Sequence, residues 1–379
     1  MARARPLAIL LGAVWCAALF ALLLILVEAG SFLALRALAW RARAMPLPAA
    51  AMPAYRRYPW AQTFWREQKR QLSLEYHPFG LWRSRPFSGE TINVDGNGVR
   101  RTVHSRCEPG DPVIWLFGGS TMWGFGSPDW ETIPSLLARR SADQGRPVCA
   151  VNYGEDSWRA AQGVVKLTLE LKAASRPPDV VVFLSGCNDV LTPFFLTGRA
   201  DREWDFAQSK PWLDDLANRG GGSLLYLGAT NTAELVRRVA TRLKGPAAWP
   251  APSDPEGLAR EVVDDFFRSM AVLDALSRGY GFRYTSFWQP LAVADGKSLT
   301  AEERDGVRRQ LGASYEAGRE AASRTSALIR DRPRPHVHSI ADLFARDTGS
   351  LYIDSCHFLP EGNRIVADRI QRALDAAGR

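Results

Sequence analysis

The sequence predicts an α/β protein, a three-layer αβα sandwich around a central, mostly parallel five-stranded sheet, preceded by one N-terminal transmembrane helix. Two observations lead to this prediction. Within residues 112–379, five short apolar runs alternate with stretches whose apolar residues recur at helical spacing, as in a parallel sheet covered by helices on both faces. Near the amino terminus, residues 6–27 carry no charge, and a run of that length fits a helix that crosses a membrane.

The five predicted strands are short and rich in β-branched and aromatic residues, as strands buried on both faces are. They cover residues 113–117, 148–152, 180–184, 282–287 and 336–340. The helices predicted between and after them cover residues 132–140, 160–174, 258–276, 301–329 and 361–376. The helix at 258–276 follows Asp254-Pro255, which is a typical helix start.

The uncharged run at 6–27 predicts an uncleaved membrane anchor within residues 1–44. A helix of this length spans roughly 33 Å, enough for a hydrocarbon layer of about 30 Å. Arg3 and Arg5 precede the run, so a cleaved signal peptide is the main alternative. The apolar core of a signal peptide is shorter, however, at about 7–15 residues.

Residues 45–111 are predicted to form a linker and a strap. The linker at 45–53 is rich in Pro and Ala, and residues 55–101 are rich in Trp, Tyr, Phe and Arg. We expect this aromatic strap to pack on the main domain, which covers residues 112–379. Residues 191–255 interrupt the strand–helix alternation, and we interpret them as an inserted subdomain or lid within that domain.

The composition excludes two broad classes of protein. With 46% hydrophobic and 23% charged residues, the chain is not intrinsically disordered. A net charge of +8 invites a nucleic-acid interpretation, but the 48 basic residues are scattered among acids without a basic run. The glycine-rich turn after the first strand also lacks the sequence of a phosphate-binding loop. We therefore expect no nucleic-acid partner.

Chemically active residues follow four of the five predicted strands. Ser120 and Thr121 follow the first strand, Gly154 follows the second, Asn188 lies just beyond the third, and Asp354 to His357 precede the last helix. The carboxyl ends of parallel strands meet at one edge of a sheet, where ligands bind. The sequence therefore predicts that a nucleophile, an amide and an acid–base pair converge there.

In these residues the chain resembles the SGNH hydrolases of the GDSL esterase/lipase superfamily. The turn Gly-Gly-Ser, which ends at Ser120, matches the family's Gly-Asp-Ser, and Gly154 matches its second conserved block. Asn188 lies in a Gly-x-Asn-Asp sequence that matches the third block, and Asp354 with His357 matches the final Asp-x-x-His. The match runs in the family's order from about residue 113 to 376 and leaves the anchor, strap and insertion uncovered.

The resemblance implies a flavodoxin-like SGNH hydrolase fold, with Ser120 as nucleophile, His357 as base and Asp354 as the third member of the triad. One residue departs from the family pattern, because Gly119 stands where the family has an aspartate. That aspartate is not the family's catalyst, so the departure bears on subfamily and substrate more than on chemistry.

The same roles follow from the residues themselves. A serine hydroxyl needs an adjacent base to become a nucleophile. Of the five histidines, only His357 lies beyond a strand's carboxyl end with a carboxylate three residues before it, Asp354, close enough to orient the imidazole. The N–H groups of Ser120 and Gly154, together with the Asn188 amide, are predicted to form an oxyanion hole.

Two further residues are weaker candidates for the substrate pocket. Gln289 follows the fourth strand, and Trp123 lies close to the nucleophile. A simple turn and core packing are the more ordinary roles of such residues. The sequence has no CxxC or His-rich spacing typical of a metal site, and we expect neither a metal nor a cofactor.

We therefore expect a serine esterase that hydrolyses O-acyl esters, acetyl esters in particular, of an extracytoplasmic carbohydrate or lipid through an acyl-serine intermediate. An O-acyltransferase that moves acetyl groups onto a cell-envelope or exopolysaccharide sugar is the first alternative. A non-catalytic module for binding or assembling polysaccharide is the second. The expected partners are the acylated substrate and, through the N-terminal helix, the membrane.

The cysteines bear on the compartment. Cys16 lies in the apolar run, and the other four are an even number, which fits two disulfides in an oxidising periplasm. A disulfide between Cys187 and Cys356 would tie the Asn188 loop to the His357 loop. A pairing of Cys107 with Cys149 is its rival, and four unpaired thiols are a further alternative. Flanking arginines occur on both sides of the run and do not decide the orientation. We expect a single-pass protein of a bacterial inner membrane with its catalytic domain in the periplasm.

Overall fold

A computed structural model of the chain describes residues 4–44, 51–71, 74–194, 230–243, 254–294 and 296–377. The chain divides into two compact units. The first consists of residues 1–46 and 214–247, and the second of residues 47–213 and 248–379. Much of the predicted insertion at 191–255 lies outside the described residues, so its proposed action as a lid stays a prediction.

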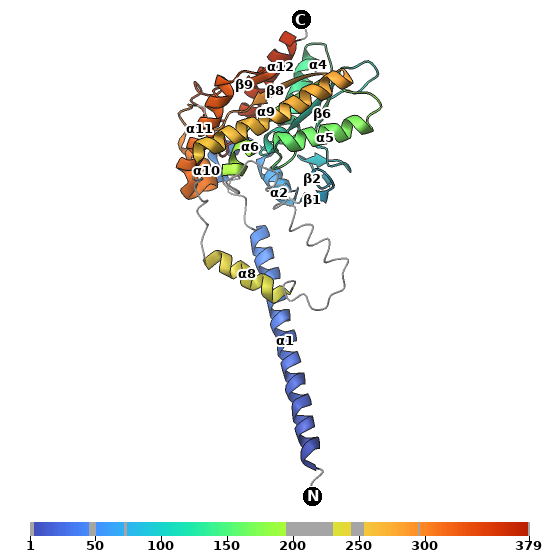
Figure 1. Cartoon of the computed structure of the whole chain (residues 1–379), viewed down its shortest axis with the longest axis vertical. Helices are drawn as coiled ribbons and strands as arrows, with labels where there is room; N and C mark the ends of the chain where they lie inside the picture. Colours follow the sequence, from blue (N-terminus) through green and yellow to red (C-terminus); the bar gives the residue numbers. More distant parts are fainter. Residues whose placement is uncertain are drawn as a thin grey trace. The chain divides into compact units, whose positions relative to one another are not determined.

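The described residues of the first unit form two helices, α1 (Ala4–Ala44) and α8 (Asn231–Leu243), which lie side by side (Figure 1). Large apolar side chains of α1 are exposed, Ile9 and Trp15 by 73% and 68%. Among the described residues, one helical stretch, Ile9–Leu38, is long and apolar enough to cross a membrane. The helix is therefore compatible with the predicted single-pass anchor.

The second unit contains a five-stranded parallel sheet in the order β6-β5-β7-β8-β9. Its strands are β5 (Val113–Gly118), β6 (Cys149–Asn152), β7 (Val180–Ser185), β8 (Arg283–Trp288) and β9 (Val337–Ser339). Every residue of β7 is buried, as expected for a central strand covered on both faces. Each strand begins and ends within one residue of its predicted bounds.

Helices cover both faces of this sheet. α4 (Ile133–Asp143) packs against α12 (Pro360–Ala377), whereas α5 (Ala160–Ala173) packs against α9 (Pro255–Tyr280), and α9 in turn packs against α11 (Tyr315–Asp331). Because crossovers between parallel strands are right-handed, these two groups lie on opposite faces (Figure 1). The predicted three-layer αβα fold is confirmed.

One predicted helix is wrong in its extent. The sequence pattern at 301–329 predicts a single helix, but the structure has two, α10 (Ala301–Leu311) and α11, joined by a 3-10 turn at Gly312–Ser314. Gly312 has a φ of 53°, a conformation that breaks a right-handed helix and that glycine adopts without steric cost. Amphipathic periodicity continues across the turn, so the pattern alone does not reveal the break.

The aromatic strap forms several short elements. They are η2 (Pro53–Arg57), α2 (Ala61–Gln71), β1 (Leu74–His77), β2 (Leu81–Ser84), β3 (Phe87–Ser88) and β4 (Asn93–Val94). Aromatic residues of η2 and α2, including Tyr55, Phe64 and Trp65, form a buried cluster with Trp123 and Leu359 of the α/β region. The strap therefore shares a core with the segments that flank the nucleophile and follow His357.

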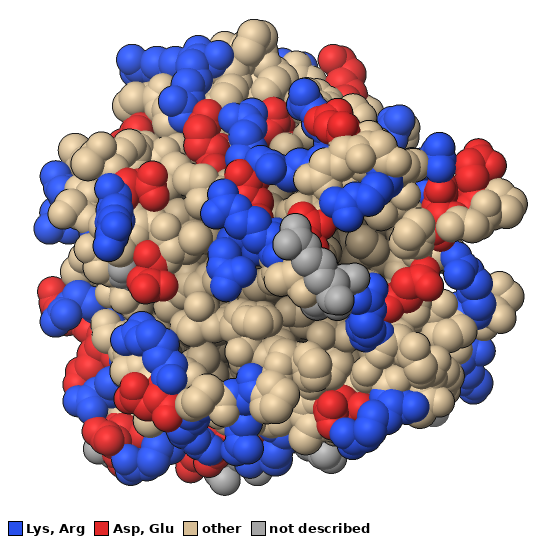
Figure 2. Space-filling view, turned by 90° about the horizontal axis from the view of Figure 1, so that it is seen from above, with Lys and Arg blue, Asp and Glu red and all other residues tan. Residues whose placement is uncertain are grey.

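The surface charges are mixed. Figure 2 shows one face of the molecule, on which basic and acidic side chains are interspersed. Many arginines pair with an acid one turn away on the same helix, as Arg260 does with Glu256 at 3.0 Å and Arg319 with Glu316 at 2.9 Å. On this face of the described residues the two signs of charge are mixed rather than gathered into one basic patch.

Candidate active site

The structure brings Ser120, His357 and Asp354 together at the carboxyl edge of the sheet. Ser120 is the first residue of the short helix α3 (Ser120–Trp123), which begins directly after β5. Its Oγ lies 2.6 Å from His357 Nε2, although the two residues are 237 positions apart. His357 Nδ1 lies 2.7 Å from Asp354 Oδ2. This is the connected arrangement of nucleophile, base and orienting carboxylate that serine catalysis requires.

The hydrogen bonds of Asp354 fix the tautomer of the imidazole. Its Oδ1 accepts the backbone N–H groups of Cys356 and His357, at 3.0 and 2.9 Å, which leaves Oδ2 to accept Nδ1–H of the ring. His357 Nε2 is then unprotonated and can accept the proton of Ser120. The Asp354 carboxylate thus binds both the backbone of the loop and the ring of His357, and so orients the imidazole.

The electrostatics of the pair agree with this assignment. Burial favours the neutral form of each group, but the mutual attraction and hydrogen bonds are stronger. As a result the pKa of Asp354 is lowered, and the pKa of His357 is raised above its ordinary value. A second carboxyl group, Asp156, adds to the raised pKa of His357. An imidazolium at His357 would therefore be stabilised by two carboxyl groups.

A hydrogen bond holds the side chain of Asn188, the predicted oxyanion donor, in place. It belongs to α6 (Cys187–Thr192), which follows β7, and its Nδ2 donates to the carbonyl of Trp158 at 3.0 Å. An amide nitrogen carries two hydrogens, so one N–H remains for a substrate. The N–H of Ser120 is at the start of α3, where a helix has no acceptor of its own. These two donors can together stabilise an oxyanion.

Gly154 lies against the nucleophile helix, but its N–H has an acceptor. A Cβ at this position would lie 2.4 Å from the backbone nitrogen of Trp123, so only glycine allows this approach. The N–H donates to Asn152 Oδ1 at 3.0 Å. Its predicted donation to an oxyanion would require that bond to be shared or broken, and this role of Gly154 stays a prediction.

The packing of Gly119 explains why glycine stands beside the nucleophile. A Cβ at this position would lie 2.5 Å from Asn188 Nδ2 and 3.0 Å from the carbonyl oxygen of Trp158. Any side chain, including the aspartate of the family pattern, would displace the amide that is predicted to bind the oxyanion. In this chain the Asn188 amide occupies the space that a side chain at position 119 would need.

Both pairings that the sequence offers as alternatives are present. Cys187 is bonded to Cys356, which ties the residue before Asn188 to the residue before His357. Cys107 is bonded to Cys149 at the start of β6. The first disulfide restrains the spacing between the oxyanion amide and the base.

Gln289 and Trp123, the two weaker pocket candidates, are both buried, with 2% exposure each. Gln289 Nε2 donates to the carbonyl of Cys356 at 3.1 Å, so this side chain supports the His357 loop. Trp123 belongs to the aromatic core, and the guanidinium of Arg100 lies 4.1 Å from its ring centroid. Both side chains therefore pack inside the protein, and their place in a substrate pocket stays a prediction.

Arg100 is a positioning residue that sequence reasoning missed. Its side chain is fully buried and ion-pairs with Asp129 at 3.0 Å. Its Nη1 donates to the carbonyls of Trp123 and Gly124, at 3.1 and 2.8 Å, and its Nη2 to that of Ser127 at 2.7 Å. A lone arginine in a polar loop gives no sequence signal of this role.

The loop that Arg100 holds carries Phe125, which packs on the base. The centroids of the Phe125 and His357 rings are 4.4 Å apart. Tyr55 of the strap donates to the carbonyl of Gly126 at 2.7 Å in the same loop. The strap therefore restrains one side of the imidazole, while the disulfide restrains its backbone.

Two adjacent carboxyl groups were also missed. Glu155 accepts hydrogen bonds from the N–H and hydroxyl of Ser84, at 2.6 and 2.7 Å, and burial raises its pKa to about 7. Burial raises the pKa of Asp156 as well, while the nearby His357 opposes this shift. Glu155 thus fastens β2 to the turn that carries Gly154, and Asp156 lies within electrostatic reach of the base.

Three potential metal ligands, from Asp354, Cys356 and His357, lie within 4.8 Å of one another. The sulfur of Cys356 is bonded to Cys187, so this cluster offers no thiolate. Both ring nitrogens of His357 already make hydrogen bonds, to Ser120 and Asp354. The cluster fits the serine–histidine–aspartate arrangement better than a metal site.

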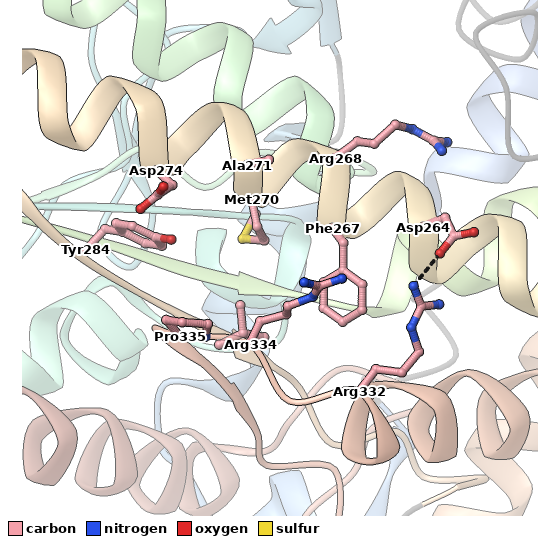
Figure 3. Close-up of a pocket in the computed structure, with 11 residues that line it drawn as sticks. Asp264, Phe267, Arg268, Met270, Ala271, Asp274, Tyr284, Arg332, Arg334 and Pro335 are labelled. Atoms are coloured by element: carbon pink, nitrogen blue, oxygen red, sulfur yellow. Dashed lines mark ion pairs between the residues drawn. The ribbon is translucent and has the colours of Figure 1, made fainter.

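A surface hollow of about 490 Å³ lies away from these residues, between α9 and the segment before β9. Arg332 pairs there with Asp264 at 2.8 Å, and the guanidinium groups of Arg332 and Arg334 each lie 5.2 Å from the Phe267 ring centroid (Figure 3). None of the triad or oxyanion residues lines this hollow.

The role of Asp354 can be tested on the titration of His357. Asp354→Asn removes the carboxylate that raises the pKa of the imidazole, so this pKa is expected to fall, and kcat to fall by on the order of 10⁴-fold. NMR of histidine-labelled protein measures the titration, with His357→Ala to assign the signal. The exposed Asp342→Asn serves as control. An unchanged or raised pKa in Asp354→Asn would contradict the role.

The packing around Gly119 leads to a second test. Gly119→Ala places a methyl group where the Asn188 amide lies, so kcat for a p-nitrophenyl ester is expected to fall by about 10²-fold, as when one oxyanion donor is lost. Gly349→Ala is the matched control, because a Cβ there meets no atom within 4 Å. Near-wild-type activity of Gly119→Ala would show that the amide is not needed in this position.

No family model matches the chain, and no curated protein matches it at a significant level. Solved structures with a similar arrangement include an acetyl xylan esterase, AlAXEase (16% identity, 69% of this chain and 98% of the other, TM-score 0.34). They also include a member of the lipolytic protein G-D-S-L family from Veillonella parvula, with 13% identity over 70% of this chain and 98% of the other and a TM-score of 0.37. The esterase EstA from Pseudoalteromonas has 11% identity over 70% of this chain and 98% of its own, with a TM-score of 0.34.

In the order of its motif residues and in its three-layer architecture, the chain resembles the SGNH hydrolase superfamily.

Proposed function

We propose that the protein is a membrane-anchored serine esterase that hydrolyses O-acyl esters, acetyl esters in particular, of a carbohydrate or lipid outside the cytoplasm. One observation carries the proposal, the unbroken hydrogen-bond chain from Ser120 Oγ through His357 to Asp354, with distances of 2.6 and 2.7 Å. A non-catalytic polysaccharide-binding module has no need of such a chain, and the arrangement argues against that alternative.

In the first half of the reaction, Ser120 Oγ attacks the acyl carbon and His357 Nε2 takes the serine proton. The carbonyl oxygen becomes an oxyanion, which the N–H of Ser120 and the free N–H of Asn188 stabilise. The bond to the alcohol then breaks, and the alcohol leaves with the proton from His357. The product of this half is the acyl-Ser120 ester.

In the second half, a nucleophile with a hydroxyl group releases the acyl group. Water gives up a proton to His357 as its oxygen attacks the acyl carbon. The bond between the acyl carbon and Ser120 Oγ then breaks, and His357 returns the proton to Oγ, which yields a carboxylic acid and free Ser120. A sugar hydroxyl in the place of water would yield a new ester, which is the O-acyltransferase reaction. The triad serves both reactions equally, so the outcome depends on which acceptor reaches the acyl-enzyme.

The compartment is part of the proposal. The apolar helix α1 supports a single-pass anchor, and the two disulfides are of the kind that forms in an oxidising compartment. A bacterial inner membrane with the catalytic unit in the periplasm fits both observations. An acylated envelope carbohydrate or lipid would meet the enzyme there.

The proposal is tested with the full chain in detergent micelles. Wild type is expected to react with a fluorophosphonate probe and to hydrolyse p-nitrophenyl acetate, whereas Ser120→Ala should lose labelling and, on the order of 10⁴-fold or more, its turnover. Ser88→Ala, at an exposed position on β3, is the control. Wild type that neither labels nor hydrolyses would overturn the enzyme assignment. Addition of sugar acceptors and detection of acetylated sugar then separate transferase from esterase.

A further inference from the structure

Glu28 is the first charged residue after the uncharged run at 6–27, and its carboxylate is fully engaged by α8. Oε1 accepts the backbone N–H and the side-chain amide of Asn231, at 2.5 and 2.7 Å. Oε2 accepts the N–H and the hydroxyl of Thr232, at 3.0 and 2.8 Å. Ser31, one turn further along α1, adds a hydroxyl contact to Thr232 at 3.0 Å.

This contact is a helix cap supplied by another helix. The first N–H groups of a helix have no acceptor within it, and the positive end of the helix dipole attracts a carboxylate. Glu28 satisfies two of these N–H groups of α8. An ionised side chain at the end of an apolar span is costly unless it is paired in this way. The start of α8 is thereby fixed beside the end of the apolar run of α1.

The remaining surface of α8 is amphipathic. At 100° per residue, Ala233, Val236, Val239 and Ala240 share one side of the helix. Val236 and Val239 are exposed by 62% and 48%, so the described part of the chain leaves much of this side uncovered. Arg238 lies on the other side and pairs with Glu234 at 2.6 Å.

We infer that α8 lies in the interface of the membrane that α1 crosses, with its apolar side against the acyl chains. The inference rests on the proposed membrane anchor. The uncharged run at 6–27 is long enough to span the hydrocarbon layer. Glu28 is the first charged residue of the candidate stretch Ile9–Leu38, and we place the membrane boundary there, beside the start of α8. The α8 sequence has three arginines and one glutamate, and arginines on such a helix bind anionic lipid headgroups.

The inference gives part of the 191–255 insertion a function. The chain passes between the two units at 46/47, 213/214 and 247/248, so the catalytic unit is joined to the anchor unit by three connections. With both α1 and α8 bound to the bilayer, the enzyme is attached to the membrane twice. Such an attachment favours ester substrates that are held at the membrane surface over freely diffusing ones.

The test uses the full chain in nanodiscs of phosphatidylcholine and phosphatidylglycerol. A Cys16→Ser background removes the cysteine that is not in a disulfide, and single cysteines then carry the fluorophore NBD. Val239→Cys reports the apolar side of α8, Arg238→Cys is the matched control on the opposite side, and Leu19→Cys reports the anchor. Quenching by spin-labelled lipids measures contact with the bilayer.

Strong quenching is expected at Leu19 and Val239, with the Val239 probe quenched at least about twofold more than the Arg238 probe. Quenching at Leu19 with none at Val239 would overturn the inference and leave the anchor intact. No quenching at Leu19 would overturn both. Val239 shielded from lipid but cross-linked between chains would mean that a second copy covers this side, and would also overturn the inference.

Glu28→Ala provides the second arm. Loss of the cap is expected to lower quenching at Val239 and to leave quenching at Leu19 unchanged, because α1 needs no contact with α8 to span the bilayer. Unchanged quenching at Val239 would overturn the role assigned to Glu28.

Discussion

The hydrogen bond between Ser120 and His357 is the constraint on which the rest of the catalytic unit depends. It joins residues 237 positions apart at 2.6 Å, a distance that tolerates little error in the placement of either segment. A parallel sheet makes it possible, because the carboxyl ends of its strands meet at one edge. β5 delivers Ser120 to that edge, and the segment between β9 and α12 delivers His357.

Two features outside the triad help to hold this distance. The disulfide of Cys187 with Cys356 links the oxyanion loop to the base. The buried guanidinium of Arg100 holds the carbonyls of the loop whose Phe125 packs on the imidazole. Positioning of this kind matters because a misplacement of about 1 Å can cost a large factor in rate. The aromatic strap is thus part of the catalytic unit and not merely a connection to the anchor.

The sequence predicted the fold and the triad because both are encoded in short, ordered signals. Strand–helix alternation revealed the sheet, and the residues after each strand revealed Ser120, Asn188, Asp354 and His357. Arg100, Phe125 and Asp156 were missed because their roles arise from contacts between distant segments. The same limit applies to Trp123, which is close to Ser120 in sequence, and to Gln289, which follows the fourth strand. Neither position showed that the side chain would be buried. Gly119 was noticed as a departure, but its reason, the Asn188 amide in the space of a Cβ, is visible only in three dimensions.

The central claim is that Ser120 and Asn188 hold the reacting group while His357 serves as base. A crystal structure of the full chain inactivated by a phosphonate ester, a mimic of the tetrahedral intermediate, tests it most directly. We expect a phosphorus–Ser120 Oγ bond, with one phosphonyl oxygen within hydrogen-bond distance of Ser120 N and Asn188 Nδ2. The Gly154 N–H joins these donors if it leaves Asn152. A phosphonate on another residue, or one whose oxygens face away from Asn188, would rule out this mechanism.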